Sequence, residues 1–105
     1  MNKREAIERK VVTHLYQTAI AAGFGLVVVD DGGANIKCAT KKALLDAVFA
    51  VDLCIIWFKH PVYGRHCASI VLGNDGWDCI ADCSTGEGWD DVMEVMSVYV
   101  ETLEY

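Results

Sequence analysis

The sequence predicts a single α+β domain in which an antiparallel sheet of about four strands carries helices mainly on one face. Apolar residues recur every three or four positions near both ends of the chain, which is typical of amphipathic helices. Short runs rich in β-branched and aromatic residues lie between these ends, and turn-forming residues separate them. The predicted order is α-β-α-β-β-β-α, and residues 1–105 suffice for one domain with its own core.

The first element is a helix over residues 3–22. Its apolar stripe recurs at helical spacing, and Gly23 follows the last periodic residue as a natural stop. The stripe consists of Ile7, Val11, Leu15, Thr18, Ala19 and Ala22.

A strand over residues 24–29 follows, because this apolar, β-branched run is too short for a stable helix. Residues 30–33 form a turn of two aspartates and two glycines, and residues 34–39 suit an extended connection. Thr40 then caps a second helix over residues 41–50.

Residues 53–58 form a strand with almost no polar side chain, which favours a central position in the sheet. Residues 59–65 form a hairpin loop, and residues 66–72 form the next strand. The Gly-Asn-Asp-Gly sequence at 73–76 predicts a tight turn into a strand over residues 77–83, since these residue types tolerate positive φ.

We expect the last three strands to be neighbours in sequential order and the strand at 24–29 to lie at an edge. Alternation in the last hairpin places one apolar set of side chains toward the core. That set is Ala68, Ile70, Leu72, Trp77, Cys79 and Ala81, and the opposite set is Ser69, Val71, Asp78, Ile80 and Asp82.

Residues 84–88 form a linker to a last helix over residues 89–103. Asp90 and Asp91 fall in its first turn, where the helix dipole favours negative charge. Its predicted packing stripe is Val92, Val95, Met96, Tyr99, Val100 and Leu103.

Charge is divided unevenly along the chain. Residues 74–105 contain nine acids and no Lys or Arg, whereas residues 1–73 contain all nine basic residues and six acids. This distribution argues against direct binding of nucleic acid and favours a protein partner with a basic surface. The alternative that the acids only confer solubility stays open.

No apolar run approaches the length of a transmembrane helix, and the N-terminus lacks the pattern of a signal peptide. We therefore expect a cytoplasmic protein that does not bind membranes. The five cysteines are an odd number, and without an export signal they favour buried thiols over disulfides.

Residues 70–85 follow the pattern aliphatic-Gly-Asn-Asp-Gly-aromatic-Asp-x-Ile-x-Asp and precede a C-terminal helix. This hairpin, together with the helix opening at residues 3–8, resembles a family of small uncharacterised proteins carried on prophages and other mobile elements. The resemblance implies an accessory protein in a bacterial host cell and carries no catalytic roles. Cys79 and Cys83 stand where such proteins accept other apolar or aromatic residues.

Catalytic and metal-binding chemistry finds little support in the sequence. A zinc site needs four converging ligands, but strand alternation directs Cys67 and Cys79 to opposite faces. Acidic surroundings disfavour a reactive thiolate at Cys83, and Asp78 and Asp82 are too far apart along one strand to share a cation. We therefore predict no catalytic residue, no metal and no cofactor.

The favoured hypothesis is a non-enzymatic interaction module that inhibits a host nucleic-acid-binding or defence protein. Its predicted binding residues are Asp78, Asp82, Asp90, Asp91 and Glu94, with Trp89 or Tyr63 as an aromatic anchor. One alternative is a structural homo-oligomer, a homodimer for example, paired through the strand at 24–29 or through an apolar helix surface. The other is a small metal protein or enzyme that uses the Cys and His residues.

Overall fold

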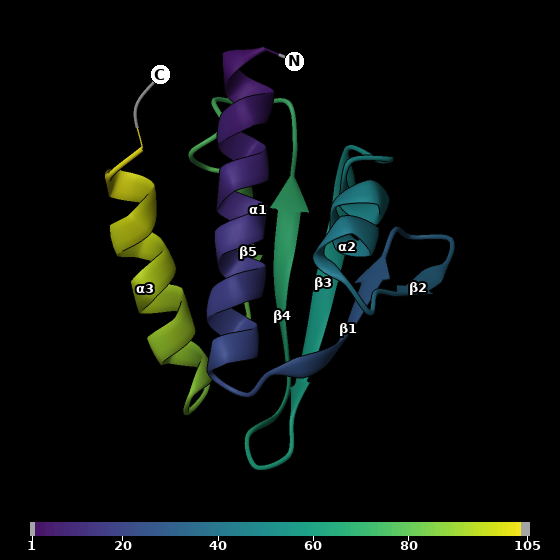
Figure 1. The fold of residues 1–105 in the computed structure, drawn as a ribbon, viewed down its shortest axis with the longest axis vertical. Coiled ribbons are helices and arrows are strands. Elements are labelled where there is room, and N and C mark those ends of the chain that lie inside the picture. Colours follow the sequence, from purple (N-terminus) through teal and green to yellow (C-terminus); the bar gives the residue numbers. More distant parts are fainter. Residues whose placement is uncertain (1, 104–105) are drawn as a thin grey trace.

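The computed structural model describes residues 2–103, which form three helices and one five-stranded antiparallel sheet (Figure 1). In chain order the elements are α1 (Lys3–Ala21), β1 (Gly25–Asp30), β2 (Asn35–Lys37), α2 (Lys41–Val48), β3 (Leu53–His60), β4 (Gly64–Val71), β5 (Ile80–Cys83) and α3 (Trp89–Glu101). The predicted α+β class is confirmed, and the sheet has one strand more than expected. Among these residues, no helix has both the length and the apolar character that crossing a bilayer requires.

The strand order is β2-β1-β3-β4-β5, so β3 is central and the last three strands are sequential neighbours, as predicted. The prediction that β1 lies at an edge is wrong. The carboxylate of Asp31 accepts hydrogen bonds from the N–H groups of Gly33 and Ala34, and this turn folds the chain back onto β1 as β2. Consequently β1 has strand partners on both sides at residues 28–30.

The β4–β5 hairpin also differs from the prediction. The segment 72–79 leaves the sheet and packs on α1 instead of forming a tight turn. The N–H of Gly73 donates to the Glu8 carboxylate at 2.9 Å, and Gly76 lies against α1 so closely that a Cβ there would stand 3.2 Å from the Arg4 carbonyl oxygen. Asp78 therefore lies outside β5.

A register shift between β4 and β5 changes which side chains of the hairpin face the core. Ile80 pairs with Ile70 and packs against the core, whereas Ala81 is exposed, opposite to the prediction for both. Ala68, Ile70 and Cys79 are buried as expected.

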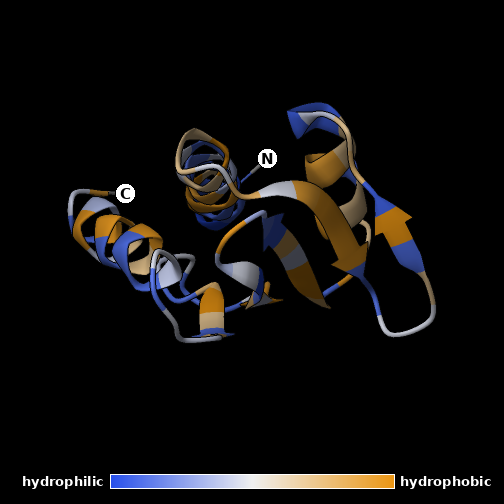
Figure 2. Ribbon diagram, turned by 90° about the horizontal axis from the view of Figure 1, so that it is seen from below, coloured by the Kyte–Doolittle hydropathy of each residue, from blue (hydrophilic) through white to orange (hydrophobic). Residues whose placement is uncertain are grey.

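The core lies between the sheet and the helices, where apolar ribbon segments face one another (Figure 2). The stripe predicted for α1 buries Ile7, Val11, Leu15 and Ala19, although Ala22 is exposed. α2 begins at the predicted cap, where the Thr40 hydroxyl accepts the N–H of Ala43 at 3.1 Å.

Candidate protein-interaction surface

The five carboxylates predicted to bind a partner are all exposed. They are Asp78, Asp82, Asp90, Asp91 and Glu94. The ion pairs found within residues 2–103 join residues of a single helix, in α1 or α2, and none includes these five. Lysines and arginines from the first part of the chain therefore leave these carboxylates without a cationic partner.

Four of these acids lie around the first turns of α3, and the fifth lies apart. Asp82 and Asp90 both lie near Cys83, where burial and the charges of these two carboxylates raise the pKa of the thiol. Asp91 and Glu94 line a groove together with His14 of α1. Glu94 lies one helical turn from both Asp90 and Asp91, so these three acids are neighbours. Asp78 stands apart in the segment that packs on α1.

The side of α3 that bears Asp91 and Glu94 also exposes two valines. Val95 is 46% exposed and Val98 is 60% exposed, although both are aliphatic. The four residues fall at i, i+3, i+4 and i+7, which places them on one helical face. We call these four residues the α3 face.

A stacked pair of rings borders the α3 face. His14 of α1 lies parallel to Tyr99 of α3, with ring centroids 3.7 Å apart and an interplanar angle of 2°. With the α3 face, this pair lines a shallow groove. The groove is open because α3 is the outermost helix and has α1 on only one side (Figure 1).

The prediction that Val95 belongs to the packing stripe is therefore wrong. α3 buries Val92 and Met96, as predicted, and Trp89 in addition. One buried side suffices for a helix at the end of a layer, so the remaining valines stay at the surface. Val98 and His14 were not predicted as surface features, although the i, i+3, i+4, i+7 spacing of the α3 face is visible in the sequence.

Trp89 cannot serve as an exposed anchor, because its exposed fraction is 0%. Its ring packs against Phe24 at 5.1 Å, against Phe58 at 5.3 Å and nearly parallel to His66 at 5.7 Å between centroids. The chain turns at Gly88, where φ is +80°, and directs the first residue of α3 into the core. Trp89 thus holds α3 on the sheet.

Tyr63 is 39% exposed and remains available as an anchor. It lies in the turn between β3 and β4, where its ring packs on that of His60 with centroids 4.5 Å apart. The same ring covers Gly88 so closely that a Cβ at that glycine would collide with it. Tyr63 therefore lies beside the start of α3 and near its first-turn acids.

The histidine and cysteine residues form local contacts. His66 donates through Nε2 to the carbonyl oxygen of Tyr63 at 3.2 Å, so its Nδ1 accepts from the Ser84 hydroxyl at 2.9 Å in the neutral ring. The Ser84 oxygen also accepts the N–H of Cys67 at 3.0 Å. This network joins β4 to the segment after β5 and fixes the ring that stacks on Trp89.

Thiol chemistry is disfavoured at the most buried cysteine. Burial, with the charges of Glu8 and Asp78 adding to it, raises the pKa of Cys79 to about 12. The thiol is therefore protonated near neutral pH and is a poor nucleophile. In the part of the chain that the structure describes, no three His, Cys, Asp or Glu side chains converge in a way that could hold a metal ion.

Comparison of this chain with protein-family models, with curated proteins and with solved structures found no match.

Proposed function

We propose that this protein is a non-enzymatic interaction module and that it binds a protein with a basic surface through the α3 face. One observation supports the proposal above the others. Asp91 and Glu94 have no cationic partner within residues 2–103, and they lie beside two exposed valines on the same helical face. A small apolar centre with a charged rim is the usual composition of a protein-binding surface.

The chemistry of the α3 face indicates what kind of partner it fits. Its carboxylates would pair with Lys or Arg, while Val95 and Val98 would cover apolar surface between those cations. A protein that binds nucleic acid presents such cations to phosphates, so the carboxylates would occupy the place of the phosphates. We therefore propose that the partner is a host nucleic-acid-binding or defence protein, and that this chain inhibits it as an accessory protein of a mobile element.

Tyr63, Asp82 and Asp90 extend the proposed contact around the start of α3. Tyr63 supplies a half-exposed ring that is held in place by His60 and Gly88. A ring that is already ordered loses little conformational entropy when it becomes buried. These residues are secondary to the α3 face because Asp82 and Asp90 each accept a local backbone N–H, from Cys83 and Gly86.

The test is capture of a partner by the immobilised protein, with the partner identified by mass spectrometry. Glu94→Lys reverses a charge of the α3 face, and Asp52→Lys makes the same charge change at an exposed site away from α3. We expect a captured protein with a basic surface whose binding is lost with Glu94→Lys and kept with Asp52→Lys. Circular dichroism verifies that both variants fold.

Equal capture by both variants would show that the α3 face is not the binding site. Capture that depends on net charge alone would weaken with both variants to the same extent. A captured protein without a basic surface would contradict the proposed chemistry.

A further inference from the structure

The second face of the sheet carries no helix (Figure 2). Side chains alternate along each strand, so the residues between the buried ones point to this bare face. Trp57 and Val28 are half-buried there, and Leu26 beside them is 77% exposed. Leu26 has φ +49° at the point where the β1–β3 register shifts, and its side chain stands beside the sheet instead of packing in the core.

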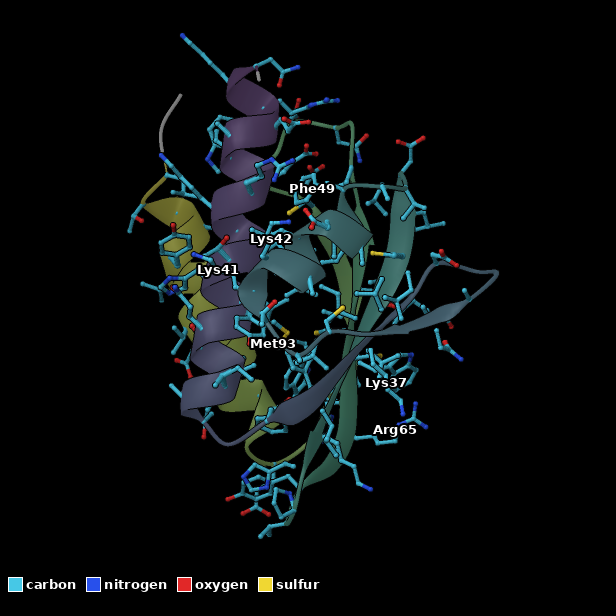
Figure 3. The ribbon with its side chains drawn as sticks, turned by 45° about the vertical axis from the view of Figure 1, so that its right-hand side comes forward. Lys37, Lys41, Lys42, Phe49, Arg65 and Met93 are labelled. Carbon is cyan, nitrogen blue, oxygen red and sulfur yellow. The ribbon has the colours of Figure 1, made fainter. Side chains whose placement is uncertain are left out.

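Three cations surround this apolar area. Val28 of β1 is paired with Lys37 of β2 on one side and with Trp57 of β3 on the other. Two residues beyond Trp57 in β3, Lys59 is paired with Arg65 of β4. The guanidinium of Arg65 lies 4.4 Å from the centroid of the Trp57 ring. Figure 3 shows Lys37 and Arg65 close together on this side of the molecule, and both line the same groove.

We call this groove, with Val28 and Trp57 as its floor and Lys37, Lys59 and Arg65 around it, the sheet groove. None of its three cations forms an ion pair within residues 2–103. Its one acid is Asp30, whose carboxylate already accepts the N–H of Gly32 at 2.9 Å. The sheet groove is therefore an apolar floor with an excess of positive charge.

We infer that the sheet groove receives the α3 face of a second copy of this chain. The two surfaces are complementary: one has exposed valines beside unpaired carboxylates, and the other has an apolar floor beside unpaired cations. They belong to opposite layers of the fold and cannot meet within one molecule (Figure 2). The inference rests on the proposed function of the α3 face: the protein with the basic surface is a second copy of this chain.

The chemistry of the sheet groove favours a protein occupant over single-stranded nucleic acid. Binding of bases requires exposed ring faces for stacking, but Arg65 already covers a face of Trp57, the sheet groove's large aromatic ring. The α3 face brings two carboxylates to the groove and offers its valines to the apolar floor.

Because the two surfaces differ, contact between two copies leaves one surface of each kind unused. Such a contact continues into longer assemblies unless a ring closes, and a reciprocal dimer is the smallest ring. The assembly therefore has a property that a test can exploit: blocking one surface on each of two variants allows a single contact between them.

The experiment uses two variants in which one surface each is altered. The groove variant carries Lys37→Glu and Lys59→Glu, which leaves Arg65 on Trp57. The helix variant carries the neutral changes Asp91→Asn and Glu94→Gln, so the two altered surfaces do not attract each other. We expect the wild-type protein to form dimers or larger species in light scattering and sedimentation as its concentration rises. Each variant alone should stay monomeric, and an equimolar mixture should form a one-to-one heterodimer.

A matched control separates the local contact from general repulsion. Lys3→Glu with Lys41→Glu changes the net charge as much as the groove variant does, at exposed sites on α1 and α2 (Figure 3 labels Lys41). This control should assemble like the wild type. Formation of the heterodimer also proves that the groove variant and the helix variant are folded.

Three results would overturn the inference: a wild-type protein that is monomeric at every concentration, variants that assemble like the wild type, or a mixture that does not form the heterodimer. Binding of a labelled single-stranded oligonucleotide that the groove variant loses would assign the sheet groove to nucleic acid instead. A monomeric wild type that captures a basic protein through Glu94 would leave the proposed function intact and remove only the second copy as its partner.

Discussion

At the scale of single residues, a buried thiol makes the stability of this fold depend on pH in the alkaline range. Burial, with smaller effects from the charges of Asp31 and Asp30, raises the pKa of Cys54 from 9.0 to about 11. The thiol of the unfolded chain therefore loses its proton at lower pH than the thiol of the folded chain. Its contribution to stability is complete below pH 9 and is lost as the pH rises toward 11.

We predict that the free energy of unfolding, measured by urea denaturation, falls between pH 9 and 11 less steeply in Cys54→Ala than in the wild type. The difference in slope should reach up to about 1.4 kcal/mol per pH unit for this one thiol. The variant loses some stability at every pH through the missing sulfur, but that loss does not change the slope. Parallel pH profiles of the two proteins would contradict the prediction.

The roles of individual side chains were only partly predictable from the sequence. A glutamate in an amphipathic helix is expected at the surface. Glu8 of α1 is only 1% exposed, because its carboxylate accepts the N–H of Gly73 from the segment packed on α1. The sequence predicts Trp89 as an anchor, and only the rings packed around it show that it is a core residue. Both outcomes depend on contacts between segments far apart in the chain, which a local pattern does not contain.

Helices and long strands were found from the sequence, whereas their connections were not. The apolar periodicity of α1 and the continuous apolar run of β3 reflect burial, so they identify these elements directly. β2 has three residues, all exposed, and therefore has no periodic signal. The Gly-Asn-Asp-Gly sequence predicts a tight turn, but packing of this segment on α1 overrides the local preference.

Docking of the segment 72–79 on α1 can be measured by comparing two glycines. Gly76 has φ +101° and Gly32 has φ +91°, so alanine at either site costs about 1–2 kcal/mol in backbone conformation. A Cβ at Gly76 would also lie 3.1 Å from the Ile7 side chain, whereas a Cβ at Gly32 meets nothing within 4 Å. We expect Gly76→Ala to lower the free energy of unfolding, measured by urea denaturation, by more than Gly32→Ala does. Equal losses would show that the segment does not pack tightly on α1.

The candidate surfaces required the whole fold. The sequence shows that the acids are concentrated in residues 74–105, but it does not show that Asp78 lies apart from the acids of α3. The sheet groove is less visible still, since Lys37, Lys59 and Arg65 come from three strands and are brought together by the strand order. Placing β1 at an edge would have separated Lys37 from the other two cations.

The unpaired acids give the whole molecule a measurable response to salt. The molecule carries a net charge of −6. Each ion pair within residues 2–103 joins two side chains of the same helix, α1 or α2, and such pairs contribute little to stability. Repulsion among the carboxylates around α3 should therefore be the main electrostatic effect that salt screens. Between about 10 mM and about 150 mM NaCl the Debye length falls from about 30 Å to about 8 Å.

We expect the Tm of the dilute, monomeric protein at neutral pH to rise by a few degrees over this range, since about 1 kcal/mol shifts the Tm of a domain of this size by about 4–8 °C. Glu94→Lys removes one of the mutually repelling charges, so its Tm should rise less over the same range. A Tm that falls with salt would mean that cations already neutralise these acids. In that case the α3 face would have no free charge to offer a partner, and both the proposed function and the sheet groove's second copy would lose their electrostatic basis.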